Sequence, residues 1–353
     1  MLQMNKEIIV FIVHTEFQLM FALNVIRSEY YTNESRVIVV RANPYTANRL
    51  NRDFDFSGTN IEYIEIRYSV KRFKDKKLKD DLDNLIELNI NKLYVFHENN
   101  VVVGYLIRKL YKKAEIILGP DGNNAYFQNF CNDESFSLSA RMKQWIGDNL
   151  YYLSNGLIIY RPIPRKWYAH RKEIGSVIVE YPDDYTNKTG KTVISIPPIC
   201  KNKNSLELIC HVFQYSISHN IPRNSFLWID QPLPDEIRNK KFDLLLSLKN
   251  RYPNREIFIK PHPTGRPPED LQMFHKLFPG KIILDNVPME LIIANLNEVT
   301  LLSWSSSALL YRNDTCNYYY VNKIFNAGGD FLQYDIMKSF SFIKIPSKIE
   351  EIV

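Results

Sequence analysis

A lysine and a histidine stand between prolines where an apolar run ends, in EIFIKPHPTG at 256–265. The prolines fix their own backbone angles and restrict the residues before them, so Lys260 and His262 are held with little conformational freedom. A cationic imidazole beside a lysine suits a phosphate that gains negative charge as it leaves. We interpret the pair as anion-binding residues; the alternative is a proline-rich surface turn.

A row of serines forms a second candidate site, in TLLSWSSSALLY at 300–311. An apolar strand is predicted to run into Ser305, Ser306 and Ser307, and a helix to begin at the ALLY that follows. Serine is a favoured N-cap, and a helix start presents unpaired N–H groups and a positive dipole end to an anion. The pattern favours a phosphate-binding loop, whereas capping alone would need only one serine.

Carboxylates mark two loops in the first half of the chain. Asp121 lies in GPDG at 119–122, where Pro120 and Gly122 predict a tight turn after an apolar run. Glu98 follows His97 at the end of KLYVFHE. A carboxylate at such a loop can act as a general base; a surface Asp-Gly turn is the alternative for Asp121.

The elements that must position these residues are short apolar runs that alternate with amphipathic stretches. Strands are predicted at 7–13, 36–42, 61–67, 92–98 and 114–119, and helices at 17–31, 80–90 and 101–113. This alternation predicts an α/β fold with βαβ units and parallel sheets covered on both faces. In such folds the loops at the carboxyl ends of the strands carry function.

A polar, turn-rich stretch, PDDYTNKTGK at 182–191, separates this series from a second one. We predict a linker there, between Rossmann-like domains at 1–181 and 192–353, and a length of 353 residues suits two domains. The segment 127–172 is predicted to be helical closing structure of the first domain. Two doubly wound domains facing a central cleft form the GT-B arrangement of many glycosyltransferases.

The composition narrows the functional class. A net charge of +6 suits an anionic ligand or acidic lipid head groups and is too small for a nucleic-acid-binding face. The four cysteines show no metal or disulfide spacing, which suits reduced thiols in the cytosol. We expect no signal peptide and no spanning helix.

A basic, aromatic stretch has two interpretations: a solvated helix face, or a surface that docks on anionic lipid or lipopolysaccharide. Its residues are Arg161, Arg165, Lys166, Trp167, Arg171 and Lys172.

Taken together, the motifs resemble those of the bacterial GT-B sialyltransferases, which have an acidic pair before a glycine, then histidine-proline, then a serine pair. Here PDG at 120–122, with Tyr126 four residues later, precedes KPHP at 260–263 and SSS at 305–307, in the same order. HTEFQL at 14–19 also looks like the nucleotide-sugar side of glycosyltransferase family 52 and its capsular polysialyltransferase relatives.

The resemblance implies an inverting, metal-independent transfer of sialic acid, or a related nonulosonic acid, from its CMP ester. The acceptor would be a hydroxyl of a bacterial surface glycan such as lipooligosaccharide, O-antigen or capsule, and no cofactor is implied. The expected location is the cytoplasm, with the inner membrane surface and a homodimer as open alternatives.

Site roles follow from the same resemblance. His262 would assist the departing CMP phosphate. The family's usual base is the first acid of the pair, where this chain has Pro120, so either Asp121 or Glu98 is expected to replace it. The expected substrate-binding residues are Lys260, Ser305, Ser306, Ser307, Gln231, His14 and Gly122.

Two other functions stay open at this point. A CDP-polyol phosphotransferase of the teichoic-acid polymerase type also has a GT-B domain, a histidine-proline element and serines at a helix start. The third reading, an inactive GT-B module that binds a nucleotide or glycan, gains weight only if no carboxylate lies near His262.

Overall fold

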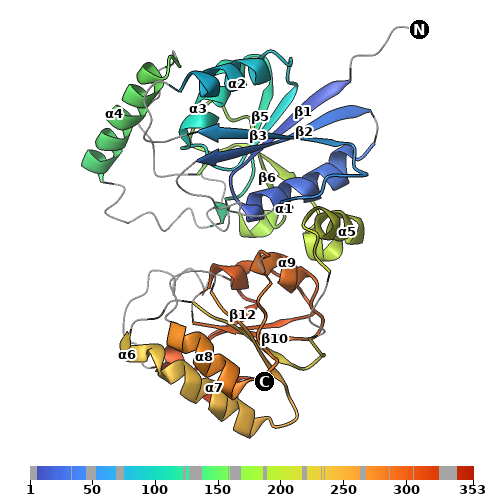
Figure 1. Ribbon diagram of the computed structural model, residues 1–353, viewed down its shortest axis with the longest axis vertical. Coiled ribbons are helices and arrows are strands. Elements are labelled where there is room, and N and C mark those ends of the chain that lie inside the picture. Colours follow the sequence, from blue (N-terminus) through green and yellow to red (C-terminus); the bar gives the residue numbers. More distant parts are fainter. Residues whose placement is uncertain are drawn as a thin grey trace. The chain divides into compact units, whose positions relative to one another are not determined.

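The computed structural model divides the chain into two compact units, Met1–Gln214 and Tyr215–Val353 (Figure 1). Both are α/β units built on parallel sheets, which confirms the predicted fold class. The described residues are 6–32, 34–44, 53–68, 75–121, 125–126, 137–157, 159, 168–185, 189–216, 221–231, 233, 235–262, 268–285, 287–304, 306–325 and 340–353.

The N-terminal unit has, in its described residues, a seven-stranded parallel sheet of order β3-β2-β1-β4-β5-β6-β7. Its strands are β1 (Glu7–Val13), β2 (Ser35–Pro44), β3 (Ile61–Tyr68), β4 (Lys92–Val95), β5 (Glu115–Leu118), β6 (Ser176–Val179) and β7 (Thr192–Ser195). The interior strand β1 is apolar without alternation because both faces of the sheet are covered. The first five strands confirm those predicted from the sequence.

Helices cover both faces of this sheet. They are α1 (Glu16–Val25), α2 (Lys76–Ile86), α3 (Val101–Leu110), α4 (Leu138–Ser154) and α5 (Lys203–Val212). Val10 and Ile12 of β1 join the core cluster that contains α2 and α3. Phe11, on the opposite face, stacks on Tyr94 with 4.3 Å between the ring centroids.

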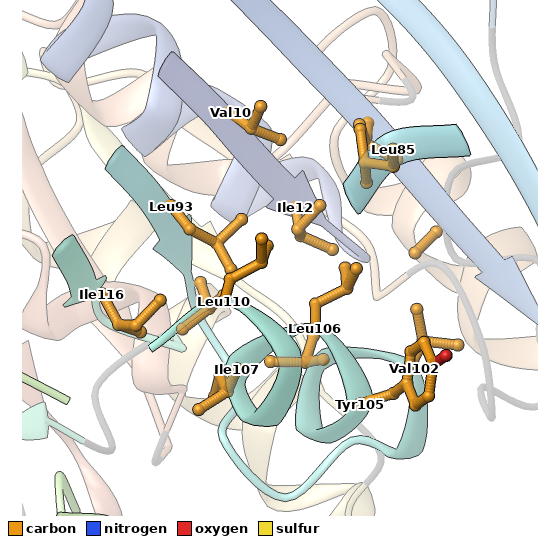
Figure 2. Packing of buried hydrophobic residues seen from close by; sticks show 14 of the residues in the cluster. Val10, Ile12, Leu85, Leu93, Val102, Tyr105, Leu106, Ile107, Leu110 and Ile116 are labelled. Atoms are coloured by element: carbon orange, nitrogen blue, oxygen red, sulfur yellow. The ribbon is translucent and has the colours of Figure 1, made fainter. Parts of the chain in front are cut away.

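Helix α3 shows how local sequence and packing agree. Its N-cap Asn100 accepts hydrogen bonds from the backbone N–H groups of Val102 and Val103, at 2.9 and 3.3 Å. Its apolar side chains, among them Leu106 and Leu110, pack on the side chains of β1, β4 and β5 (Figure 2). Each such buried side chain stabilises the fold by about 1.5–3 kcal/mol.

The C-terminal unit has, within its described part, a parallel sheet of order β12-β11-β10-β8-β9. The strands are β8 (Phe226–Ile229), β9 (Ile257–Lys260), β10 (Thr300–Ser303), β11 (Asn317–Tyr320) and β12 (Ile343–Lys344). The helices are α6 (Asp235–Arg238), α7 (Lys240–Arg251), α8 (Pro268–Leu277) and α9 (Met289–Ala294). Trp228, Phe274 and Trp304 lie in its core.

The predicted linker at 182–191 does not separate the two units. It connects β6 to β7, and β7 pairs with β6 from Ser176↔Thr192 to Val179↔Ser195, so it extends the first sheet. The unit ends after Gln214, which has a left-handed φ of 49°. Turn-rich composition marks a surface connection, and a short crossover between parallel strands has the same composition as a linker.

Two further expectations from the sequence concern helices. Helix α4 confirms helical structure in the segment 127–172, of which 127–136, 158 and 160–167 lie outside the described residues. No helix in the described part of the chain is both long and apolar enough to cross a bilayer.

Gly119, directly after β5, leaves no space for a side chain. A Cβ there would lie 2.5 Å from Cε1 of Phe96, whose buried ring packs edge-on against Phe21. We expect Gly119→Ala to lower the free energy of unfolding by about 1–3 kcal/mol, as overpacked cores do. Denaturant unfolding measures this, with Gly147→Ala as control, because a Cβ on Gly147 meets nothing within 4 Å. That change should stabilise helix α4 by up to about 1 kcal/mol; equal effects of the two changes would contradict the packing argument.

Candidate functional site

The carboxyl ends of β1, β4 and β5 bring the first group of candidate residues together. Ile12 pairs with Val95 and Val95 pairs with Leu118, so the three strands end side by side. His14 follows β1, His97 and Glu98 follow β4, and Asp121 follows β5. The strand order reverses between β1 and β4, and this switch point is where parallel sheets open a crevice for ligands.

Gln18 connects this edge to helix α1. Its Oε1 accepts a hydrogen bond from the backbone N–H of His14 at 2.8 Å, and its Nε2 donates to Asp121 Oδ1 at 2.7 Å. Thr15 starts α1 as N-cap by accepting from the Gln18 N–H, at 3.2 Å, and so places the buried Gln18 side chain under the loop. HTEFQL and PDG, which lie about a hundred residues apart in the sequence, are thereby joined by one side chain.

The Asp121 carboxylate is oriented and still accessible. Gln18 holds Oδ1, and Oδ2 lies 4.0 Å from His97 Nε2, which is beyond hydrogen-bond distance. The Asp121 side chain is 26% exposed and that of His97 is 47% exposed. Such a carboxylate can accept a proton from a hydroxyl that approaches Oδ2.

His14 is neutral at this edge. Burial, with a smaller contribution from the nearby His97, lowers the pKa of His14 to about 4. Both ring nitrogens are buried, and smaller effects of the Asn100 and Gln18 side chains oppose the lowering of the pKa. A contact between His14 and a substrate stays a prediction.

Glu98, the other candidate base, is enclosed. Its side chain is 6% exposed; Oε1 lies 3.2 Å from His170 Nδ1, and Oε2 accepts from the Arg171 N–H at 3.2 Å. These contacts fasten the segment at 168–171 to the end of β4. Of the two carboxylates, that of Asp121 is therefore the more accessible.

Arg171 does not contribute to a docking surface. It is buried, and its Nη1 donates to the Glu98 carbonyl at 3.2 Å while Nε lies 3.9 Å from Glu173 Oε2. Residues 161–167 of the basic stretch lie outside the described residues. A basic residue counted as surface in the sequence thus serves the interior, where an opposite charge offsets its desolvation.

Glu180 is a residue that the sequence analysis missed. It follows β6, and its Oε1 accepts from Asn24 Nδ2 at 2.8 Å and from the Ile199 N–H at 3.1 Å. Burial raises its pKa to about 8, so it carries a proton at neutral pH. The signal that could have found it is the position itself, a carboxylate directly after the apolar run at 176–179.

The motif tyrosine lies near this acid. Burial, followed by the neighbouring Glu180, raises the pKa of Tyr126 above its ordinary value. The ring centroids of Tyr126 and Tyr181 are 6.4 Å apart. Gly122, the motif glycine, lies outside the described residues.

In the C-terminal unit the carboxyl ends of β8, β9 and β10 gather the second group. Ile229 pairs with Lys260 on one side and with Ser303 on the other. Gln231, His262 and Ser306 follow these three strand ends within three residues, so they share one edge of the sheet. The predicted positions after strands are therefore confirmed for these three side chains.

Ser303 connects two of these loops. Its buried hydroxyl donates to the Ile229 carbonyl at 2.9 Å, lies 3.3 Å from Gln231 Oε1 and accepts from the Ser306 N–H at 3.2 Å. Ser303, the last residue of β10, therefore sets the position of Gln231 and of the loop that contains Ser306. No such role for Ser303 was predicted from the sequence.

The serine loop differs from its prediction. Ser306 caps only a four-residue 3-10 turn, Ser307–Leu310, by accepting from the Ala308 N–H at 3.3 Å. The turn ends because Tyr311 is extended (φ −81°, ψ 108°) and directs the chain towards β11. One turn offers fewer unpaired N–H groups in line than an α-helix does. Ser305 and the Ser307 side chain lie outside the described residues.

Lys260 has a partner that the sequence did not indicate. Its Nζ donates to the backbone carbonyl of Asp285. The lysine therefore fastens the chain that follows the Ile259↔Ile282 bridge. A role for Lys260 towards a ligand stays a prediction.

The two edges suit different parts of a group transfer. The N-terminal edge offers an oriented carboxylate with imidazoles beside it, which can receive a proton. The C-terminal edge offers an imidazole, a hydroxyl and an amide, which can hold an anion. No cluster of three or more metal-ligating side chains occurs among the residues that the structure describes.

Comparison with known families adds one match. The model of the alpha-2,8-polysialyltransferase family matches residues 9–319. A sequence search of curated proteins finds no match.

Comparison with solved structures supports the two-domain GT-B fold. The GT-B domain of the sialyltransferase from Photobacterium damselae superposes with a TM-score of 0.57 at 14% identity, over 96% of this chain and 98% of that one. A 2,6-sialyltransferase from Photobacterium sp. JT-ISH-224, solved with CMP and lactose, gives 0.53 at 12% identity, over 96% and 78%. The UDP-GlcNAc 2-epimerase from Methanocaldococcus jannaschii gives 0.55 at 11% identity, over 99% and 90%. At these identities the likeness concerns the fold.

The raised pKa of Glu180 generates a prediction of pH dependence. Between its ordinary value of 4.5 and about 8, the folded protein keeps a proton that the unfolded chain has lost. The contribution of Glu180 to stability is therefore greatest below about pH 4.5 and decreases until about pH 8. Glu180→Gln retains the acceptor oxygen for Asn24 and removes this ionisation.

We expect the melting temperature of Glu180→Gln, relative to the unmodified protein, to rise between about pH 5 and pH 8.5. Thermal unfolding at several pH values measures it. The exposed Glu207 on α5 supplies the control Glu207→Gln, whose difference should not change with pH in this range. A Glu180→Gln curve parallel to that of the unmodified protein would contradict the raised pKa.

Proposed function

Because the chain belongs to the alpha-2,8-polysialyltransferase family and transfers sialic acid to a glycan, we propose its donor, its acceptor class and the roles of its site residues. The donor is CMP-sialic acid or the CMP ester of a related nonulosonic acid. The linkage formed is α-2,8, in keeping with the description of the family. One observation carries the proposal: within this family match, Asp121 stands at the switch point of the first sheet, oriented by Gln18.

Asp121 acts as the general base. As the acceptor oxygen bonds to the anomeric carbon, its proton passes to Asp121 Oδ2 and the bond from that carbon to the CMP phosphate breaks. The configuration at the anomeric carbon is inverted, because the acceptor oxygen attacks on the side opposite to the departing CMP. Support comes from the 2.7 Å bond that fixes Oδ1 and from the exposure of the carboxylate.

The C-terminal unit binds the departing CMP without a metal ion. His262 donates a proton or a charged hydrogen bond to the phosphate as its negative charge increases. Ser305, Ser306 and Ser307 hold the same phosphate, Lys260 offsets its charge, and Gln231 contacts the base or ribose. The common edge of β8, β9 and β10 supports this assignment for the described residues among them.

The acceptor is a bacterial surface glycan, namely lipooligosaccharide, O-antigen or capsule, bound by the N-terminal unit with His14 and Gly122. We place the reaction in the cytoplasm at the inner face of the membrane, with the net charge of +6 favouring acidic lipid, and we propose a homodimer. No nucleic acid or cofactor takes part.

The family assignment favours sialyl transfer over the CDP-polyol phosphotransferase. An inactive nucleotide-binding or glycan-binding module would need Asp121 and His262 to be dispensable, which the following experiments decide.

We expect CMP to raise the melting temperature more than UDP or UMP does, with no magnesium requirement. At a concentration of about 100 times Kd, binding stabilises a protein by about 2.7 kcal/mol. His262→Ala should lose at least part of the CMP effect, while His275→Ala on the exposed side of α8 should keep it. Differential scanning fluorimetry with each nucleotide measures these shifts; protection by UDP as strong as by CMP would point to another nucleotide-sugar donor.

Asp121→Asn and Glu98→Gln distinguish the two candidate bases. We expect Asp121→Asn to lower sialyl transfer by at least about tenfold, on the scale of a lost general base, with the melting temperature nearly unchanged. Glu98→Gln should lower the melting temperature, because it weakens a buried network, and affect turnover of the folded enzyme less. Release of CMP coupled to acceptor is the readout. The reverse result would assign the base to Glu98.

A further inference from the structure

Four charged side chains form a buried network beside the carboxyl edge of the second sheet. Lys241 Nζ, on α7, lies 3.2 Å from Asp230 Oδ1 and 2.6 Å from Asp270 Oδ2. Arg238 Nε lies 2.6 Å from Asp270 Oδ1 on its other side. Asp230, Lys241 and Asp270 have side-chain exposures of 0%, 1% and 3%, so two acids and one ammonium are removed from water together.

Desolvation of these charges opposes folding and reduces what the network can contribute to stability. Burial raises the pKa of Asp230 although Lys241 opposes this, so desolvation exceeds the attraction of the ammonium. Trp228 Nε1 also donates to Asp230 Oδ1, at 3.1 Å, while the buried Oδ2 has no hydrogen bond among the described residues. Buried ion pairs are often no more stabilising than apolar side chains of the same volume, so stability alone is a weak account of this arrangement.

The position of the network suggests another role. Asp230 is the residue before Gln231, and its backbone N–H donates to the Lys260 carbonyl at 2.9 Å, two residues before His262. Asp270 lies in the first turn of α8, which follows His262 in the chain. The ammonium of Lys241 thus connects the end of β8 to the start of α8. The backbone hydrogen bond between Asp230 and Lys260 connects the end of β9 to the same network.

Rings enclose the same ammonium. Lys241 Nζ is 5.1 Å from the ring centroid of Phe274 on α8 and 5.2 Å from that of Phe242 on α7. These contacts restrict the lysine to one position between α7 and α8. A charge held in this way can transmit a fixed geometry, because neither carboxylate can move without losing its partner.

We propose that Asp230, Lys241, Asp270 and Arg238 are positioning residues that hold His262 and Gln231 at the site through the strand ends and helix start that flank them. The inference rests on the proposed role of His262 in the departure of CMP. It assigns to four residues outside the motifs a part in turnover, without contact with the substrate.

The first test is Asp270→Asn, which keeps the shape of the side chain and removes its charge. We expect kcat for CMP-dependent sialyl transfer to fall by about tenfold or more, since small displacements of a catalytic group have effects of this size or larger. KM for the acceptor should stay within about threefold, because acceptor binding belongs to the other unit. Leu245→Ala, a core change on α7 that leaves the charges intact, is the control for lost stability.

Arg238→Gln provides a milder variant, because Arg238 is 24% exposed and its loss is less damaging to the fold. We expect a smaller fall in kcat, restored by Arg238→Lys, which keeps a cation beside Asp270. Lys281→Gln removes a 2.6 Å pair with Glu256, before β9 and thus at its opposite end, and should leave kcat unchanged. Equal loss of kcat in Asp270→Asn and in Leu245→Ala at matched stability, or activity within about threefold of normal in Asp270→Asn, overturns the proposal.

Hydrogen exchange separates this proposal from the proposed function. In Asp270→Asn, amides of residues 257–262 and 268–277 should exchange faster than in Leu245→Ala, whether or not His262 takes part in catalysis. Unchanged exchange there overturns the positioning role. Full turnover in His262→Ala overturns the leaving-group role instead, and the exchange result would still report on the network.

Discussion

The register of parallel strands is the constraint on which both candidate sites depend. Ile12, Val95 and Leu118 are neighbours in the first sheet, and Ile229 lies between Lys260 and Ser303 in the second. Residues two or three positions beyond these partners must therefore meet at one edge. A shift by one residue would turn each following side chain to the other face, so apolar burial of the strands also determines where polar groups of the site stand.

Buried polar side chains then orient the groups that the strands deliver. Gln18 does so for Asp121, and Ser303 does so for Gln231 and Ser306. Each is nearly or fully buried, so an unmade hydrogen bond would cost about 1–3 kcal/mol and the geometry is held firmly. The more accessible candidate residues are thus oriented by buried polar side chains that fix their direction.

The difference between residues placed by strand ends and residues placed by long-range contacts explains which sequence predictions were confirmed. Strands and the residues after them were predictable because apolar runs of this length, followed by turn residues, have few other structures available. Asp121, His262 and Ser306 all stand where such runs end. The α/β class and the family resemblance follow from this pattern and from the order of the motifs, and the family match over residues 9–319 confirms the resemblance.

Other features could not be predicted, because they depend on contacts between distant residues. The stretch at 182–191 looks like a linker by composition, and only the pairing of β7 with β6 shows that it belongs to the first unit. Arg171 looks like a surface cation but is buried among Glu98 and Glu173, and Lys260 bonds the Asp285 carbonyl. The sequence by itself therefore determined the elements, the family and the residues at the strand ends, since local apolar patterning and motif order specify these. Only the tertiary structure decided which of those residues are exposed, which are enclosed and which buried charges lie behind them, because burial and electrostatic partners are properties of residues brought together by folding.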